Sequence, residues 1–351
     1  MINQITIRQP DDWHLHLRDG AVLKSVLPYT SRVFGRAIIM PNLLPPITSI
    51  KEAQAYRKRI LSNLPIDVCF TPLMTAYITE SLNINELKKG FKEGVFTAAK
   101  LYPFNSTTNS SYGVRDIKSI YSLFEEMEKI DMPLLIHGED SDPNVDIFDR
   151  EFSFIEKYLK KLVNDFPGLR IVLEHITTKE AAEFVISCGE NVAATITPHH
   201  LHINRNAMFF QGFRSDFYCL PVVKREIHRK ALRKAAISGN PSFFLGTDSA
   251  PHLRPSKENS CACAGIFNAP YAIESYAEVF DEENALDRLE GFCSEYGAAF
   301  YKLPLNKKSI TLIKNKQKIP DFIEVCEVDG KKDLIAPFHG GQYLNWSLCK
   351  K

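Results

Sequence analysis

The 351-residue chain has no long apolar run and almost no net charge. No stretch approaches the length of a membrane-spanning helix, and the polar N-terminus leads directly into a strand-like pattern, which argues against a secretion signal. A formal net charge of +1 provides no global field that would hold nucleic acid or an anionic membrane. We therefore expect a cytoplasmic protein whose partner is a small molecule, with any anionic ligand held by a local cationic cluster.

The cysteines form no compact framework; they are scattered as Cys69, Cys188, Cys219, Cys261, Cys263, Cys293, Cys326 and Cys349. A chain of this size does not need disulfides, so free thiols in a reducing cytoplasm are expected. Cys261 and Cys263 could suggest a thiolate zinc site, but no second cysteine pair lies at zinc-finger spacing. We interpret this pair as part of a tight loop that lines a pocket.

What the chain does have is a regular alternation of short apolar runs and longer amphipathic stretches. Each run is nearly continuously apolar, as expected for strands buried on both faces of a parallel sheet. The predicted strands cover residues 5–17, 35–42, 66–75, 95–103, 133–139, 170–176, 191–198 and 243–252. Two of the helices begin with capping-box patterns, Ser49 with Glu52 and Thr177 with Glu180.

Eight β/α units within about 250 residues are typical of a TIM (β/α)8 barrel. A doubly wound open sheet is the alternative, but it requires a glycine-rich turn after the first strand, where this chain has HLHLRDG. Linkers, repeats and low-complexity segments are absent from the sequence. We therefore predict a single domain over residues 1–351, an α/β barrel with a short C-terminal extension of helices and short strands from about residue 270.

Almost every predicted strand ends in a residue that can bind a metal ion or an anion. These residues are His14, His16, Arg18, Asn42, Lys100, His137, His175 and Asp248. In a parallel barrel all of these strand ends converge on one rim, where the active sites of such barrels lie. This convergence is a stronger indication of function than any single motif.

The histidines and Lys100 together predict a site for two metal ions. Residues i and i+2 of a strand point the same way, so His14 and His16 can grip one divalent cation. An ordinary ammonium at Lys100 would repel cations, and its simplest interpretation is a salt bridge at a strand end. A lysine that has taken up CO2 is instead a carbamate, whose two oxygens can bridge two cations.

Asp248 and Arg18 add candidate roles in proton transfer and in substrate binding to this site. Asp248 could be a turn residue, but at the last strand end it can ligate a metal and accept a proton from an acidified, metal-bound water. Two metals do not need an arginine, whereas an anionic substrate does, because a guanidinium binds a carboxylate with two hydrogen bonds. Asn42 and His252 could complete this clamp; the alternative is that Arg18 only pairs with Asp19.

Two further segments require interpretation. Residues 102–115 are polar and rich in small side chains, which suits either a plain connection or a mobile lid whose Thr107 and Thr108 donate hydrogen bonds to a ligand. His199, His200 and His202 follow the seventh strand. We interpret these three as loop structure or as neighbours of the ligands, not as ligands.

The chain resembles the shorter, bacterial dihydroorotases of the amidohydrolase superfamily. The motifs that carry the resemblance run from residue 11 to about residue 270: DDWHLHLRDG, IIMPNLLPP, AAKLYP, LLIHGE, LEHITT, TPHHL, YCLPVVKR, FLGTDSAPH and CACAGIFNAP. The HxH pattern alone marks only the superfamily. Its combination with Arg18, Asn42 and the region from TDSAPH to CACAGIFNAP is much more specific.

The resemblance implies roles for individual residues. It implies two Zn2+ ions per subunit, the first held by His14, His16 and Asp248 and the second by His137 and His175, with Lys100 bridging both as N6-carboxylysine. For the substrate it implies a carboxylate clamp of Arg18, Asn42 and His252, ring contacts from the Leu220 backbone and the Ala264 region, and a lid with Thr107 and Thr108.

The resemblance also implies a homodimer and a reaction. The reaction is the reversible cyclisation of N-carbamoyl-L-aspartate to L-dihydroorotate plus water in pyrimidine (UMP) biosynthesis. A metal-bridging hydroxide would be the nucleophile and Asp248 the general acid and base. The alternatives are a hydantoinase-like cyclic-amide hydrolase, which shares the metals but not the clamp, and a non-catalytic barrel, which would be expected to have lost ligands.

Overall fold

The computed structural model describes residues 2–328 and 331–349, and its centre is a barrel of parallel strands. Eight strands pair in chain order, which confirms the predicted barrel: β2 (Asp12–Leu15), β3 (Arg36–Ile39), β4 (Thr71–Tyr77), β5 (Ala98–Leu101), β6 (Leu134–Ile136), β7 (Ile171–Leu173), β8 (Val192–Ile196) and β9 (Phe243–Leu245). The backbone just after β9 returns to β2, because the amide of Asp248 donates to the carbonyl of His14 (2.9 Å) and that of His16 to Ser249 (3.1 Å).

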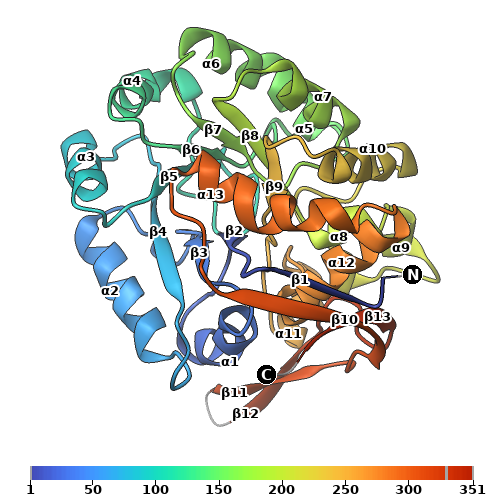
Figure 1. Cartoon of the computed structure of the whole chain (residues 1–351). Helices are drawn as coiled ribbons and strands as arrows, with labels where there is room; N and C mark the ends of the chain where they lie inside the picture. The colour runs from blue at the N-terminus through green and yellow to red at the C-terminus, as the bar shows by residue number, and fades with distance from the viewer. Residues whose placement is uncertain (1, 329–330, 350–351) are drawn as a thin grey trace.

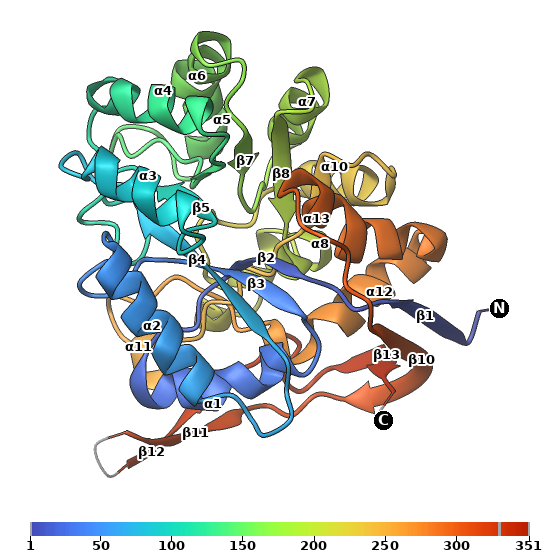
Figure 2. The ribbon, with the colours of Figure 1, turned by 60° about the vertical axis from the view of Figure 1, so that its left-hand side comes forward.

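Helices surround the strands (Figures 1 and 2). The longer ones are α1 (Gly20–Ser31), α2 (Ile50–Ser62), α3 (Ile84–Lys92), α4 (Tyr121–Lys129), the continuous run α5 (Arg150–Phe154), η2 (Ile155–Leu159) and α6 (Lys160–Asp165), α7 (Lys179–Ser187), α10 (Glu226–Ile237) and α12 (Ala272–Glu282). The short ones are η1 (Ile117–Ile120), α8 (Pro198–His202), α9 (Asn206–Phe209), η3 (Ser215–Phe217), α11 (Arg254–Lys257), η4 (Ala269–Tyr271), η5 (Leu286–Arg288), η6 (Gly291–Glu295) and α13 (Tyr296–Phe300).

Strand periodicity divides the core into two shells. In β6, Leu134 and Ile136 pack outward against the helices, whereas Leu135 belongs to a separate cluster inside the barrel. The same alternation places Val172 of β7 and Phe244 of β9 inside. All of these residues are buried, which explains why each predicted strand is apolar on both faces.

The segment 5–17, predicted as one strand, is two strands in the structure. β1 (Gln4–Arg8) pairs antiparallel with β10 (Ser309–Lys318), which in turn pairs with β13 (Tyr343–Leu348). Figure 1 shows this three-stranded sheet beside the barrel, with the first and last parts of the chain adjacent. Pro10 lies between β1 and β2 and has no amide hydrogen to continue a ladder.

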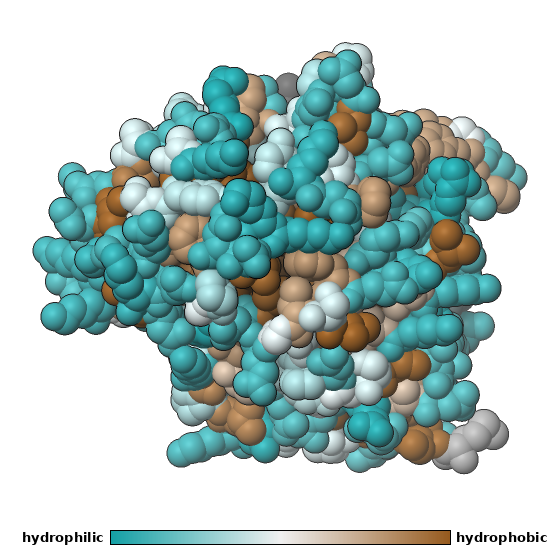
Figure 3. All heavy atoms as spheres, turned by 90° about the horizontal axis from the view of Figure 1, so that it is seen from above, coloured by the Kyte–Doolittle hydropathy of each residue, from teal (hydrophilic) through white to brown (hydrophobic). Residues whose placement is uncertain are grey.

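A β-hairpin completes the C-terminal extension. Its strands are β11 (Ile323–Val328) and β12 (Lys331–Ile335), and it packs beside α1 (Figure 2). The short C-terminal strands predicted from about residue 270 are therefore present, after helices α12 and α13. None of the described helices is both long and apolar enough to span a bilayer. The face shown in Figure 3 is mostly hydrophilic, and its hydrophobic residues form small separate patches.

Two local predictions need correction. The strand expected over residues 66–75 begins only at Thr71, because Ile66 is 91% exposed and residues 66–67 form a turn. The predicted capping box of Ser49 and Glu52 is confirmed at the start of α2. The second capping box is wrong: Thr178, not Thr177, caps α7, because its side-chain oxygen accepts the hydrogen bond from the Ala181 amide (3.1 Å).

Candidate active site

Strand periodicity directs two of the candidate residues into the upper barrel. Ala98 of β5 lies inside the barrel, so Lys100, two residues later, also points inward. Leu135 of β6 is likewise inside, which directs His137 to the same space. The Lys100 side chain is completely buried, although it carries an amine.

Left-handed backbone conformations bring in two further residues. His175 has φ = 44° and Asp248 has φ = 45°, a region that non-glycine residues rarely adopt. At the end of β7 this turn lets both Glu174 and His175 reach the barrel interior, since strict alternation would send one of them outward. The His175 amide is fixed by a 2.7 Å hydrogen bond to Thr195 Oγ1. Such strained positions are typical of functional sites.

The first histidine group is tightly convergent. His14 Nε2 and His16 Nε2 lie 3.2 Å apart, and Asp248 Oδ1 lies 3.3 and 3.1 Å from them. The other nitrogen of each ring faces an oxygen: His14 Nδ1 is 2.9 Å from Glu174 Oε1, and His16 Nδ1 is 2.9 Å from Asn42 Oδ1. Both rings are thus oriented with Nε2 toward a shared point, as in a metal site whose ligands are held by outer partners.

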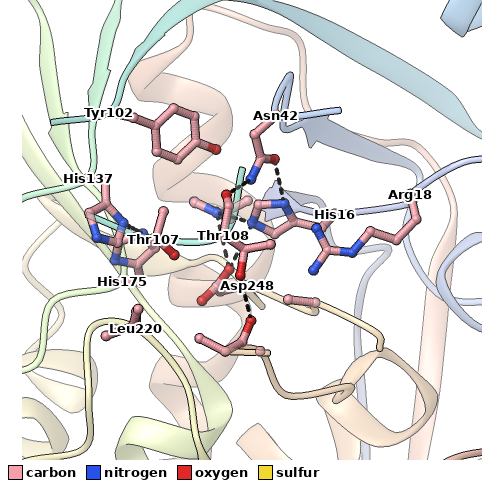
Figure 4. Close-up of a pocket in the computed structure, with 14 residues that line it drawn as sticks. His16, Arg18, Asn42, Tyr102, Thr107, Thr108, His137, His175, Leu220 and Asp248 are labelled. Atoms are coloured by element: carbon pink, nitrogen blue, oxygen red, sulfur yellow. Dashed lines mark hydrogen bonds and ion pairs between the residues drawn. The ribbon is translucent and has the colours of Figure 1, made fainter. Parts of the chain in front are cut away.

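The second histidine pair adjoins the first group (Figure 4). His137 Nδ1 lies 3.2 Å from His175 Nε2, and Glu139 Oε2 accepts from the opposite nitrogen of His137 at 2.9 Å. The His175 ring centroid is 4.8 Å from that of His14 and 4.8 Å from that of His137. His175 therefore connects the two groups.

Lys100 lies between these groups and contacts Glu174. Its Nζ is within hydrogen-bond reach of Glu174 Oε2. Burial lowers the pKa of Lys100 well below its ordinary value, against the opposing charge of Asp248. A buried amine near neutral pH accordingly tends to be uncharged, with a free lone pair.

Burial also keeps the histidines neutral. It lowers the pKa of His16 to about 3 and that of His175 well below its ordinary value. Burial alone would raise the pKa of Asp248, but the hydrogen bonds with His14 and His16 hold that pKa well below its usual range. Neutral imidazoles and an ionised carboxylate are the forms that ligate divalent cations.

Arg18 and His252 form a second group beside the first histidine group, and Arg18 supplies its positive charge. It has φ = 59°, and its Nη2 lies 2.9 Å from His252 Nε2 while its Nε donates to the Pro251 carbonyl. Burial, followed by the charge of Arg18, lowers the pKa of His252 to about 2. Asp19 instead pairs with Arg59 (2.8 Å) and caps α1, so the alternative of a simple Arg18–Asp19 pair is wrong.

The predicted lid segment lies across the site. Thr107 and Thr108 line the same pocket as the histidines, and Thr108 Oγ1 donates to the Ala264 carbonyl at 3.2 Å. Asn42 Nδ2 donates to the Thr108 carbonyl (3.0 Å) while its Oδ1 faces His16. Asn42 therefore links the first histidine group to the lid.

Two loops close the remaining side of the pocket, which Leu220 and Ala264 line. Buried Lys257 joins these loops: its Nζ donates to the carbonyls of Tyr218 (2.9 Å), Cys263 (3.0 Å) and Gly265 (2.8 Å). These bonds fix the backbone on both sides of the pocket-lining residues.

The three histidines after the seventh strand lie in the short helix α8, not in a loop. Both nitrogens of His200 are engaged, Nδ1 with Thr197 Oγ1 (2.8 Å) and Nε2 with the Pro221 carbonyl (3.1 Å). His199 Nδ1 faces Asn268, and His202 Nε2 bonds to the Ser275 carbonyl.

The cysteines whose side chains the structure describes do not line the pocket. Cys69, Cys188, Cys219, Cys261, Cys263 and Cys293 are free thiols, as predicted. Cys261 is exposed and Cys263 is partly buried. Cys219 Sγ lies 3.9 Å from His200 Nε2, so this thiol is near α8, where His200 already has two partners.

The structure brings all the predicted metal-site residues together, and it adds some that the sequence reading missed. Glu174 and Glu139 face the histidine rings, and Tyr102 lines the pocket. Each of these three residues stands within two positions of a predicted ligand at a strand end. This proximity was the available signal, and the predicted strand periodicity already directs Tyr102, two positions after Lys100, to the inner face.

The chain as a whole matches known proteins. Residues 10–325 match the amidohydrolase family. A dihydroorotase from Synechococcus sp. (strain RCC307) is 59% identical over 347 residues, which cover 99% of this chain and 98% of that protein.

Solved structures point the same way. A dihydroorotase from Saccharomyces cerevisiae in complex with 5-fluoroorotic acid has a TM-score of 0.89 at 34% identity, covering 99% of each chain. A dihydroorotase from Campylobacter jejuni also has a TM-score of 0.89, at 35% identity, covering 99% of this chain and 98% of that one. The chain belongs to the dihydroorotases of the amidohydrolase family.

Proposed function

We propose that this protein catalyses the reversible cyclisation of N-carbamoyl-L-aspartate to L-dihydroorotate with release of water. The observation that carries this proposal is one pocket with two kinds of group: convergent histidines with Asp248, and beside them Arg18, whose guanidinium contacts His252. The second group suits a carboxylate, which both the open-chain and the cyclic compound possess. The yeast dihydroorotase, solved with 5-fluoroorotic acid, has a pyrimidine carboxylate as its bound ligand.

The donor set fits two divalent cations. Among the described residues, the ligand atoms of His14, His16 and Asp248 lie within 4.8 Å of one another, and His137 and His175 present two further facing nitrogens. The Nδ1 of His175 is buried without a hydrogen-bond partner in the part of the chain that the structure describes. We propose that the first three residues hold one Zn2+ and the two other histidines hold the second.

Lys100 fits the role of a bridging carbamate. A lysine reacts with CO2 only through its uncharged amine, and burial favours that form here. The carbamate would supply the negative charge that a site for two cations needs. When bound, the two cations would lower the pKa of a water molecule and polarise the amide carbonyl of the substrate.

The residues of the chain then have separate tasks. In ring opening, a water oxygen adds to the ring carbonyl carbon, the ring C–N bond breaks, and Asp248 carries the proton from the water to the leaving nitrogen. Ring closure reverses these steps. Arg18, Asn42 and His252 hold the carboxylate so that the carbonyl is correctly placed, which is catalysis by positioning. Thr107 and Thr108 on the lid would exclude solvent, and Leu220 and Ala264 would contact the ring.

Replacing the clamp tests the proposal. Arg18→Ala should reduce kcat/KM for dihydroorotate by about 10²-fold or more, because a charged, two-pronged contact is lost. Zinc content should stay at the wild-type level, since Arg18 bonds to His252 and to the Pro251 carbonyl and not to the proposed zinc ligands. Arg18→Lys is the matched control for charge alone and should recover only part of the loss.

A substrate panel separates this function from a general cyclic-amide hydrolase. Wild-type protein should turn over dihydroorotate and discriminate strongly against hydantoin and dihydrouracil, which lack the carboxylate. Equal turnover of all three compounds would contradict the proposed clamp. The homodimer and the single domain over residues 1–351 stay predictions, which sedimentation and limited proteolysis can check.

A further inference from the structure

Tyr102 is the next inward-facing residue above Lys100. The alternation that directs Ala98 and Lys100 into the barrel continues to position 102, one residue beyond the end of β5. Tyr102 is 1% exposed and lines the same pocket as the histidines and Arg18. In Figure 4 its hydroxyl is directed toward the middle of the site, on the side of Asn42.

The Tyr102 hydroxyl has no hydrogen-bond partner among the described residues. Other buried tyrosines are satisfied: Tyr56 donates to the Arg18 carbonyl and Tyr276 to the Ile196 carbonyl, each at 2.6 Å. Tyr301 shares the unpartnered state of Tyr102, but it lies in the cluster inside the barrel, stacked on Trp13. A buried hydroxyl without a partner is costly, so one that lines a pocket points to a ligand.

Neighbouring rings pack against the Tyr102 ring and fix the direction of its hydroxyl. It stacks on Tyr77 with centroids 5.1 Å apart and planes at 29°, and the His137 ring is 6.1 Å away. Lys100 Nζ lies 4.8 Å from the Tyr102 ring centroid. These neighbours place Tyr102 on the histidine and lysine side of the pocket, where the reacting carbonyl must lie if Arg18 and His252 hold the carboxylate.

We propose that Tyr102 is a further catalytic residue, whose hydroxyl donates a hydrogen bond to the oxygen of the amide carbonyl under attack. This inference rests on the proposed function. As water adds, the planar carbonyl becomes tetrahedral and negative charge grows on that oxygen. A fixed donor therefore binds the transition state more strongly than the ground state, which raises kcat more than it lowers KM.

The test is Tyr102→Phe with Tyr301→Phe as its matched control. Removing one oxyanion donor costs about 10²–10³-fold in kcat in other enzymes, and here the metals would share the charge, so we expect a loss of about 10–100-fold. The KM for dihydroorotate should change less than about threefold, and zinc content should not change. Tyr301→Phe, which also deletes a buried unpartnered hydroxyl, should leave both constants at wild-type values.

Stability serves as the second readout. Because neither hydroxyl has a partner, both variants should keep or slightly raise the melting temperature. A Tyr102→Phe protein with wild-type kcat, or with raised KM at unchanged kcat, would overturn the proposal. If the wild-type protein turns over neither N-carbamoyl-L-aspartate nor L-dihydroorotate, the proposed function itself fails, and this inference fails with it. Wild-type turnover combined with an unaffected variant removes only the role of Tyr102.

Discussion

The two ends of the barrel interior are built from the same strands but carry opposite chemistry. At the closed end, Trp13 stacks on Tyr301 with centroids 4.6 Å apart and planes at 9°, and Phe244 meets the Trp13 ring edge-on. At the open rim, the same inward positions carry histidines, a lysine and carboxylates, all buried. One end is an aromatic core, and the other is a buried polar network.

The two ends also differ in backbone conformation. The closed end is filled by strand side chains together with α13 and the adjoining Tyr301. At the rim, left-handed residues interrupt strand geometry at Arg18, His175 and Asp248. Buried ionisable groups and strained backbone both reduce stability unless a ligand uses them. We infer that the closed end maintains the fold, whereas the rim gives up stability for binding and chemistry.

The largest expected effect comes from removing Lys100. Lys100→Ala should lose most of the proposed zinc and lower kcat by about 10³-fold or more, because the proposed carbamate can no longer form. The fold should persist, since the aromatic closed end is untouched. Metal analysis, a dihydroorotate assay and circular dichroism measure these three quantities.

Lys224→Ala provides the matched control for loss of a buried lysine. Lys224 is 4% exposed, and its Nζ donates to the Val222 carbonyl, outside the pocket-lining residues. This variant should lose stability but keep its zinc and its activity per folded molecule.

A small carboxylic acid added to Lys100→Ala should restore part of the activity. Full activity of Lys100→Ala without additive would refute the carbamate.

An intermediate effect is expected at the closed end. A Cβ added at Gly297 of α13 would lie 2.0 Å from Trp13 Nε1, so the aromatic stack must shift to accept it. Gly297→Ala should lower the free energy of unfolding by about 1–3 kcal/mol. The kcat of the folded protein should stay near wild type, because neither Gly297 nor the stacked Trp13 and Tyr301 line the pocket. Urea unfolding and the enzyme assay together measure the two effects.

Gly189→Ala is the control for that substitution. A Cβ at Gly189 would meet nothing within 4 Å, so its effect on unfolding should be neutral or slightly stabilising. If Gly297→Ala lowered kcat strongly while leaving stability unchanged, the division between a stabilising end and a functional end would be wrong.

The fold was predictable because its signals are local and repeated. Apolar runs of strand length alternate with amphipathic helices, and the inward and outward positions of β6, β7 and β9 follow directly from periodicity. The break after β1 was missed although Pro10 marks it, because the pairing of β1 with β10 joins residues about three hundred positions apart. Such contacts leave no local pattern.

The candidate residues were predictable as a set because the carboxyl ends of parallel strands must meet. Their partners were harder to predict. Alternation from the inward-facing Val172 directs Glu174 into the barrel but would send His175 outward, and only the left-handed turn at His175 explains why both side chains reach the site. Lys257 lies in a four-residue helix far from any strand end, and its role depends on three carbonyl groups that sequence does not encode. Backbone geometry, not residue type, limited the prediction.

The smallest expected effect on catalysis is a pH dependence through Lys257. Burial lowers the pKa of Lys257 to about 8, and the neutral amine has two N–H donors where the ammonium has three. Above about pH 8 one hydrogen bond to a carbonyl is lost, the pocket loops loosen, and the KM for dihydroorotate should rise about two- to fivefold.

The stability of the fold should increase over the same pH range, although binding of the substrate weakens. Between about pH 8 and 10.5 the folded protein binds fewer protons than the unfolded chain, so the free energy of unfolding should rise with pH, by up to about 3 kcal/mol relative to Lys257→Met. Lys257→Met should have a high KM that lacks this pH-dependent component; an unchanged rise in KM in that variant would assign the titration to another group.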